Sequence, residues 1–185
     1  MANPKLFMIM LGAKPAGRYI EQHDIFFTVA DSIKETVTAI KEFWPEGGSN
    51  LHVDAWREVT LVDGYHVALV SKETPVSTSK RLFFINLGGY QENEFDEPHY
   101  KLLLAADNMA AAVKAAKETA FYKHTGFKGA TSHIDDRYGV DVDDVYEVND
   151  ILSEQIKARY QLVLEPAAAA TADEIHLGYF QLHKL

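Results

Sequence analysis

The sequence contains no cysteine among its 185 residues. Disulfide bonds, thiolate nucleophiles and cysteine-ligated zinc or iron–sulfur sites are therefore excluded. The sequence also lacks an excess of positive charge, because 18 Lys and Arg stand against 27 Asp and Glu, and the formal net charge is −9. Its scattered basic residues form no patch of the kind that binds nucleic-acid phosphates or anionic membranes. We therefore expect neither nucleic acid nor a membrane as a partner.

Long apolar runs are absent as well. The apolar run at residues 6–11 is shorter than the apolar region of a signal peptide. No stretch approaches the ~18 apolar residues that a membrane span requires. No serine stands in a G-x-S-x-G pattern, so no nucleophile elbow is predicted. These absences predict a cytoplasmic protein, and an apolar content of 47% is enough to build a core.

The sequence does contain an internal repeat. Residues 5–31 align with residues 81–107 at a constant offset of 76, with nine identities in 27 positions. Residues 52–65 then align with residues 133–146 at an offset of 81, with five identities in 14 positions. Self-similarity of this kind indicates a duplicated structural unit.

The first copy has the pattern of a β-β-α-β-β unit. Residues 5–12 and 23–30 are rich in apolar, β-branched and aromatic side chains, which predicts two strands. Ser32 and Glu35 have the spacing of a capping box, which predicts a helix that ends at Trp44. Two further strands are predicted on either side of an Asp-Gly turn, which is a strong hairpin signal; they span residues 51–61 and 65–71.

The second copy repeats this plan with predicted strands at 81–88 and 99–106. Its helix is predicted to run from Asp107 to about Lys123. Beyond the repeated part we expect two more strands, at residues 156–164 and 174–182, that extend a sheet edge.

The predicted fold class is α+β. It consists of a tandem duplication of a β-β-α-β-β unit, mostly antiparallel sheet with helices packed on it, and pseudo-two-fold symmetry. We expect a first repeat at residues 1–72, a polar linker at 73–80, and a second repeat with a C-terminal strand extension at 81–185. The two repeats are expected to pack as one compact unit.

Several motifs occur in order and twice along the chain. They are L-F-M-I-M-L-G and L-F-F-I-N-L-G-G, E-Q-H-D and E-P-H-Y, and SHIDDRYGVDVDDVYEVNDIL. With these motifs the chain resembles, over about residues 5–165, the bacterial family catalogued as domain of unknown function 1543, in two tandem copies. The resemblance implies a small bacterial protein with one or two copies of the domain. It implies no activity and no site residue.

Two kinds of polar pair recur in both copies and are the candidate ligand-binding or metal-binding residues. They are Glu21 with His23, Glu97 with His99, His52 with Asp54, and His133 with Asp135. Because residues two apart on a strand point to the same face, each pair can present its two side chains together. Two imidazoles and two carboxylates would suit zinc, manganese or iron, or histidine–carboxylate acid–base chemistry. The alternative, which the sequence alone favours, is a structural role in orienting loops. No cofactor is therefore expected, and a divalent metal is the less favoured alternative.

Three other features have weaker functional interpretations. The acidic residues of 135–144 could bind calcium, but they lack the EF-hand order, so a solvated turn is favoured. Gly12 and Gly88 end the first strand of each copy and are expected in a tight turn or a bulge rather than in a phosphate site. Residues 121–129 could form a wall of a pocket for an acidic ligand, or an ordinary helix end.

From these features we expect a non-enzymatic scaffold that binds a small ligand or a protein partner, as a monomer or homodimer. The alternative is a metal- or histidine-dependent enzyme that acts on a small metabolite. An exposed apolar patch or groove would favour the scaffold. Convergence of Glu21, His23, His52 and Asp54, or of their counterparts in the second copy, would favour the enzyme.

Overall fold

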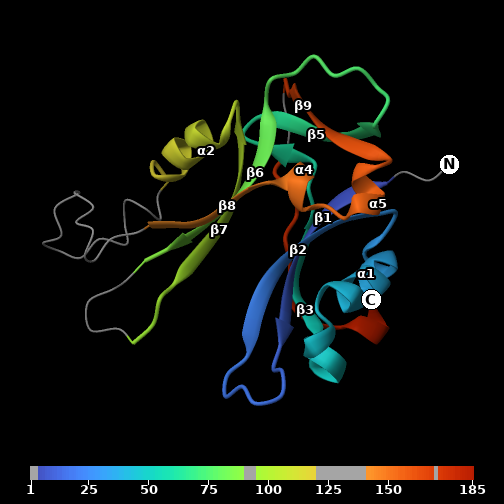
Figure 1. The fold of residues 1–185 in the computed structure, drawn as a ribbon, viewed down its shortest axis with the longest axis vertical. Coiled ribbons are helices and arrows are strands. Elements are labelled where there is room, and N and C mark those ends of the chain that lie inside the picture. The colour runs from blue at the N-terminus through green and yellow to red at the C-terminus, as the bar shows by residue number, and fades with distance from the viewer. Residues whose placement is uncertain (1–3, 90–94, 120–140, 169–170) are drawn as a thin grey trace, which may run out of the picture.

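The computed structural model describes residues 4–89, 95–119, 141–168 and 171–185, and its strands form three sheets (Figure 1). The strands are β1 (Lys5–Ala13), β2 (Gln22–Ala30), β3 (His52–Glu58), β4 (Leu61–Val62), β5 (Tyr65–Ser71), β6 (Arg81–Gly88), β7 (His99–Ala106), β8 (Asp141–Glu147), β9 (Tyr160–Pro166) and β10 (His176–Gln181). The α-helices are α1 (Val37–Phe43), α2 (Met109–Ala116), α4 (Val148–Ile151) and α5 (Glu154–Lys157). Short 3₁₀ helices are η1 (Ile33–Thr36), η2 (Pro45–Asn50) and η3 (Leu182–Lys184).

The first sheet has the strand order β10-β3-β1-β2, and its pairings are antiparallel. Strand β1 lies in its interior and is apolar at successive positions because both of its faces are buried. Leu6 belongs to the central core of the molecule, whereas Phe7, Ile9 and Leu11 pack with Ile40 of α1 on the opposite face. Alternate side chains of a strand point to opposite faces, so one apolar run serves two cores.

The second sheet has the order β7-β6-β8 and repeats this arrangement. Leu82 and Phe84 of β6 belong to the central core, and Phe83 and Ile85 face the helix α2 through Ala112. Each of these two sheets therefore carries one helix on its outer face (Figure 1).

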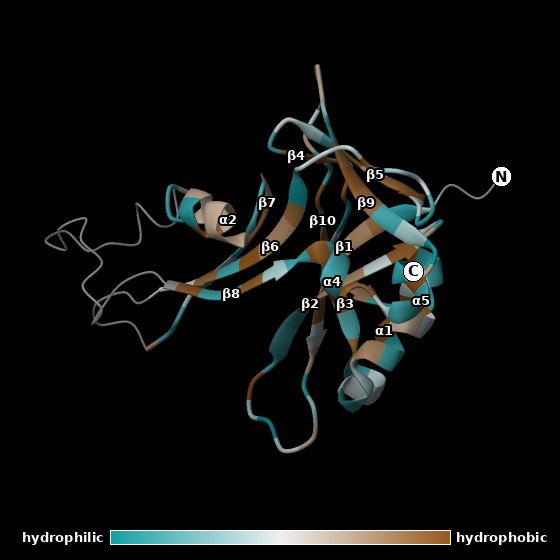
Figure 2. Ribbon diagram, turned by 45° about the horizontal axis from the view of Figure 1, so that its top comes forward, coloured by the Kyte–Doolittle hydropathy of each residue, from teal (hydrophilic) through white to brown (hydrophobic). Residues whose placement is uncertain are grey.

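The third sheet, β4-β5-β9, joins the two halves of the chain. Strand β5 of the first half pairs antiparallel with β9 of the second. In the central core, the rings of Phe27 and Phe84 meet edge to face with centroids 5.4 Å apart. Figure 2 shows apolar residues along β5, β6 and β9, the strands that approach one another at the centre of the molecule. The described parts of both halves thus share one core.

The first two sheets also share a register. Gly12 lies opposite His52 between β1 and β3, and Gly88 lies opposite Asp141 between β6 and β8. Both pairings contain a β-bulge at the equivalent place, between Met10 and Leu11 in the first sheet and between Asn86 and Leu87 in the second. Strand β8 is therefore equivalent to strand β3 at an offset of 89 residues. The predicted alignment of residues 52–65 with 133–146 is wrong for these strands, because the connection between helix and third strand is longer in the second half.

The α+β class and the antiparallel pairing predicted from the sequence are confirmed. Asp63 and Gly64 form the expected hairpin turn, with φ of 51° and 77° respectively. The predicted strand 51–61, however, is interrupted: β3 ends at Glu58, and Leu61–Val62 leaves the first sheet to pair with β5. Among the described helices, none combines the length and apolar character needed to cross a membrane.

The helix predictions need three corrections. The predicted capping box is not formed, because the Ser32 side chain caps nothing and Glu35 instead accepts a hydrogen bond from the Asp31 N–H. The first turn is a 3₁₀ helix as a result, and the α-helix proper begins at Val37. The second helix begins after Asn108, whose side chain caps it, and ends at Ala116 rather than near residue 123. The start of the predicted strand 156–164 is helical in α5.

The C-terminal strand extends a sheet edge, as predicted, but the sheet belongs to the first half of the chain. Strand β10 pairs with β3, with His176 opposite Trp56 and Gln181 opposite His52. The imidazole of His176 stacks on the Trp56 ring at a centroid distance of 3.8 Å. The end of the chain therefore lies beside the candidate site residues of the first half.

Candidate functional site

The candidate residues of the first half meet where β1 ends. Gly12 lies between His23 of β2 and His52 of β3 in the ladder. Asp54 is the extra residue of the β-bulge, since Met10 pairs with Ala55 and the next position pairs with Val53. A bulge changes the direction in which a side chain points and is frequent beside functional sites. Here it turns Asp54 toward the imidazole of His52.

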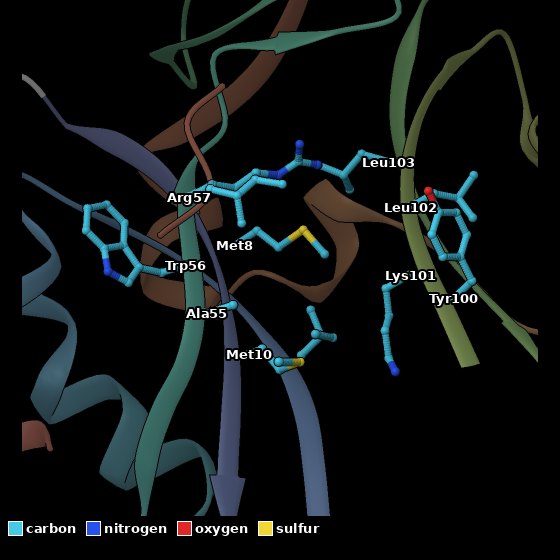
Figure 3. Close-up of a pocket in the computed structure, with 11 residues that line it drawn as sticks. Met8, Met10, Ala55, Trp56, Arg57, Tyr100, Lys101, Leu102 and Leu103 are labelled. Atoms are coloured by element: carbon cyan, nitrogen blue, oxygen red, sulfur yellow. The ribbon is translucent and has the colours of Figure 1, made fainter. Parts of the chain in front are cut away.

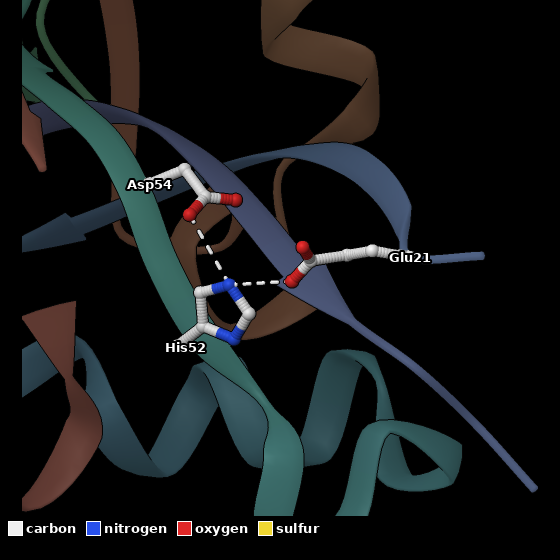
Figure 4. Close-up of side chains that lie close together, drawn as sticks. All are labelled: Glu21, His52 and Asp54. Carbon is white, nitrogen blue, oxygen red and sulfur yellow. Dashed lines mark ion pairs between the residues drawn. The ribbon is translucent and has the colours of Figure 1, made fainter. Parts of the chain in front are cut away.

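Three side chains form the first cluster, which we define as Glu21, His52 and Asp54 (Figure 4). The Nε2 atom of His52 lies 2.7 Å from Glu21 Oε1 and 3.1 Å from Asp54 Oδ1. The His52 side chain is only 5% exposed, whereas that of Glu21 is 44% exposed. Glu21 precedes β2 and reaches the cluster from outside the sheet (Figure 4). A buried imidazole thus faces two carboxylates, one of which is accessible from solvent.

The other nitrogen of His52 fixes the orientation of the ring. Nδ1 lies 2.7 Å from the carbonyl oxygen of Asn50. Because a carbonyl oxygen only accepts, Nδ1 carries the proton and donates it. Nε2 then points at two carboxylate oxygens, an arrangement that is favourable only if a proton or a metal ion lies between them. Metal-ligating histidines characteristically donate their second N–H to a backbone carbonyl in this way.

His23 lies at the edge of the first cluster. Its Nε2 is 3.3 Å from Asp54 Oδ2, within the range of an ion pair. That oxygen is nevertheless buried without a hydrogen bond among the described residues, so the contact with His23 is electrostatic in character. A buried carboxylate oxygen without a donor is costly and is usually explained by an ion or a water.

Gly12 provides the space in which these groups meet. A Cβ built on Gly12 would overlap Asp54 Oδ2 and would lie 2.5 Å from His52 Nε2. The glycine does not have a positive φ, so its role is to leave room for the cluster and not to form a turn. Of the two expectations for Gly12 and Gly88, the tight turn is not formed, since each glycine is the paired residue of a strand, and the β-bulge of the adjacent pairing lies close to each of them.

The second half has a corresponding group of side chains, the second cluster, which we define as Glu97, His99 and Asp143. His99 Nε2 lies 3.2 Å from Asp143 Oδ2, and the two side chains are 36% and 31% exposed. His99 lies opposite Gly88 as His23 lies opposite Gly12. A Cβ on Gly88 would overlap Asp143, which occupies the bulge position of β8.

The structure therefore brings together Glu21, His23, His52 and Asp54, and separately Glu97 and His99. His133 and Asp135 lie outside the described residues, as do residues 121–129. Asp143 was not among the predicted site residues. It is the equivalent of Asp54 in the second half, because β8 follows β3 at an offset of 89 and not 81. The role of the two glycines was also not predicted, although their recurrence at offset 76 was a usable signal.

A cleft of about 860 Å³ lies between the first and second sheets, and it is lined by residues of the second cluster and by His23, which lies at the edge of the first cluster. His23 contributes to its lining from the first sheet, and Glu97 and His99 contribute from the second. The phenol of Tyr146, also in the lining, donates to Asp144 at 3.4 Å. The negative charge of Asp144 raises the pKa of Tyr146 above its ordinary value, because it disfavours the phenolate.

The C-terminal strand contributes an aromatic side chain to the first cluster. The ring of Tyr179 packs against the imidazole of His52, with centroids 4.3 Å apart. Tyr179 itself is largely exposed. It thus covers one side of His52 while its own outer face remains in solvent, a contact that sequence patterns did not predict.

Fold and site together define an α+β protein with one carboxylate–imidazole cluster in each half of the chain. Residues 18–69, which contain the whole first cluster, match the model of a family described as Domain of Unknown Function (DUF1543). This match supports, for the first half of the chain, the family that the motifs resemble.

A solved structure is similar over nearly the whole chain. It is described as the crystal structure of a protein Il1583 from Idiomarina loihiensis, and it is 25% identical in sequence. The similarity covers 97% of this chain and 99% of that one, with a TM-score of 0.66. No curated protein matches the chain. The comparisons thus support the fold and name no activity.

Proposed function

We propose that this protein binds a divalent transition-metal ion at the first cluster, through His52 Nε2 and the carboxylates of Glu21 and Asp54. The observation that carries the proposal is the orientation of His52. Its Nδ1 is fixed by the Asn50 carbonyl, so its Nε2 is presented to two carboxylate oxygens. Mixed nitrogen and oxygen donors suit zinc, manganese or ferrous iron.

Three further features support a metal and not only a buried ion pair. The ligand atoms of the first cluster all lie within 4.8 Å of one another. Asp54 Oδ2 is buried and accepts no hydrogen bond from the part of the chain that the structure describes. The space above Gly12, which any other residue would fill, is kept open for the cluster. Gly88, His99 and Asp143 hold, in the second half, the positions of Gly12, His23 and Asp54, and we propose that the two halves arose by duplication of one unit.

The proposal is tested by metal content. Protein purified without chelator and without a histidine tag is analysed by mass spectrometry for zinc, manganese and iron. We expect at least one near-stoichiometric metal in the unmodified protein and its loss in His52→Gln. His66→Gln is the matched control, because His66 is exposed on β5 and belongs to neither cluster.

Thermal unfolding gives a second readout that does not depend on what the cell supplies. A ligand that binds only the folded state at 100 times its Kd stabilises it by about 2.7 kcal/mol. Added zinc or manganese should therefore raise the melting temperature of the unmodified protein and of His66→Gln but not of His52→Gln. Absence of bound metal, together with melting that neither metal nor chelator changes, would assign His52 to a structural ion pair with its two carboxylates.

A metal-dependent enzyme is a second candidate function, favoured by the cleft. His23, His99 and Tyr146 line a space large enough for a small metabolite and carry groups that transfer protons. The metal-loaded protein would then hydrolyse a simple ester or phosphate ester, and His23→Gln would lower the rate without releasing the metal. If the loaded protein has no such activity, a binding scaffold whose ligand is the metal itself remains the better description.

A further inference from the structure

A second pocket lies between the first sheet and strand β7, and it shares Ile25 and Lys101 with the lining of the cleft. Its volume is about 350 Å³, at the small end of the range for pockets that hold organic ligands. Figure 3 shows its two walls, with β1 and β3 on one side and β7 on the other. Most of the lining is apolar or aromatic, and includes Met8, Met10, Trp56, Tyr100, Leu102 and Leu103.

Each wall of this apolar pocket contributes one cationic side chain to the lining. Arg57 extends from β3 toward Leu103, and Lys101 belongs to β7 (Figure 3). Both side chains are partly buried. Burial lowers the pKa of the Lys101 ammonium, and it also lowers that of Arg57, against the opposing effect of Asp173. The residues that line the pocket therefore carry positive charge, whereas the chain as a whole has a formal net charge of −9.

The described lining of the pocket contains no carboxylate to balance these cations. Asp173 lies outside this lining; it accepts hydrogen bonds from Thr60 and Leu61, and its negative charge acts on Arg57. The Lys and Arg ion pairs formed among the described residues are Lys5–Glu58, Lys80–Asp107, Arg81–Glu147 and Lys157–Glu154. For Lys101, burial lowers the pKa with no opposing charge among the described residues, and burial of a cation without a matched anion is unfavourable unless a ligand supplies the charge.

We propose that this pocket binds a small organic carboxylate with an aromatic or aliphatic body. The carboxylate lies with Arg57 and Lys101, and the body packs on the methionines and leucines of the walls. A guanidinium presents paired N–H groups that match the two oxygens of a carboxylate. An apolar body is required because the remaining lining offers van der Waals contact and few polar groups.

The test compares phenylpropionate with phenylpropanol, which has the same body but no charge. Binding is measured by calorimetry with a chelator present, so that metal at either cluster cannot attract the acid. Hydrogen bonds to charged groups are stronger than neutral ones, and we expect the acid to bind about 10- to 100-fold more tightly than the alcohol. Lys101→Met and Arg57→Met should each reduce this preference, while binding of the alcohol persists.

Two further variants control the result. Lys101→Arg keeps the positive charge and should keep the preference for the acid, which shows that the pocket is still folded. Lys41→Met removes an exposed cation of α1 and should behave like the unmodified protein. Equal affinity for acid and alcohol, or a preference that survives in both Lys101→Met and Arg57→Met, would overturn the proposal. Failure of metal binding at His52 would leave it unaffected, because the assay excludes metal.

Discussion

Substitution of Gly12 by alanine tests the first cluster with a single methyl group. The new Cβ would overlap Asp54 Oδ2 and lie 2.5 Å from His52 Nε2, so both proposed ligands must move. Metal–ligand bonds tolerate displacements of about 0.2 Å. Changes that merely reorient a ligand cost about 10–100-fold in metal affinity. Because Gly12→Ala displaces two ligands, we expect a loss of at least about 100-fold, or about 2.7 kcal/mol.

The same methyl group also costs stability in the metal-free protein. Overpacking of a filled site costs about 1–3 kcal/mol. The backbone adds nothing to this cost, because Gly12 does not have a positive φ. Gly47→Ala is the matched control, since its Cβ would lie 3.0 Å from Leu51 and 3.2 Å from Ala13 and would touch no ligand. It should lower stability to a similar degree and leave metal affinity unchanged.

The assay is a zinc titration by calorimetry, paired with denaturant unfolding in chelator for each variant. The expected result separates the two glycines: both variants are destabilised, and only Gly12→Ala loses affinity. If Gly12→Ala binds zinc as tightly as the unmodified protein does, the cluster is not the metal site and the open space above Gly12 has only a packing role.

Three further predictions concern the fold and the cleft. Phe84→Ala should cost about 3–5 kcal/mol in denaturant unfolding, because Phe84 packs on Phe27 in the central core, whereas Phe95→Ala, at an exposed position, should stay within about 0.5 kcal/mol of the unmodified protein. Asp63→Ala should lower the free energy of unfolding by about 1–3 kcal/mol, because Asp63 has a φ of 51° and accepts the Ala105 N–H at 2.9 Å; Asp63→Asn, which tolerates this φ and keeps the acceptor, should cost less. Asp144→Asn should lower the pKa of Tyr146 toward its ordinary value of about 10, measured by phenolate absorbance, because the charge of Asp144 disfavours the phenolate; an unchanged titration would contradict this.

The strands that position the clusters could be predicted from the sequence, but the clusters themselves only in part. Apolar runs and their recurrence located β1, β2, β6 and β7 because the pattern of a strand is local. The recurring polar residues were predicted to meet if strands 23–30 and 51–61 were neighbours, but in the structure β1 lies between these strands. The contacts of His23 with Asp54 and of His52 with Glu21 form across β1 at Gly12.

What the sequence could not show was the β-bulge. A bulge adds one residue to a strand and leaves the surrounding alternation unchanged, so nothing in the pattern identified Asp54 or Asp143 as the extra residue. The acidic stretch of the second half contains several aspartates at similar spacing, and the sequence alignment matched Asp54 with Asp135. The contact of His52 Nδ1 with the Asn50 carbonyl could not be predicted either, because every residue has a backbone carbonyl and the sequence does not show which one is near.

The two clusters should differ in affinity, because the equivalent positions do not carry equivalent groups. Where the first half has the buried His52, the second half has Asp141 at the same register position. The imidazole of the second cluster belongs to His99, whose side chain is 36% exposed. A buried ligand that is already oriented loses less conformational entropy on binding than an exposed one. Zinc should therefore bind in two phases, with the tighter phase lost in His52→Gln and the weaker phase lost in His99→Gln. If both variants weaken the same phase, the two clusters act as one site across the cleft, and the metal or its ligands must bridge the two halves of the chain.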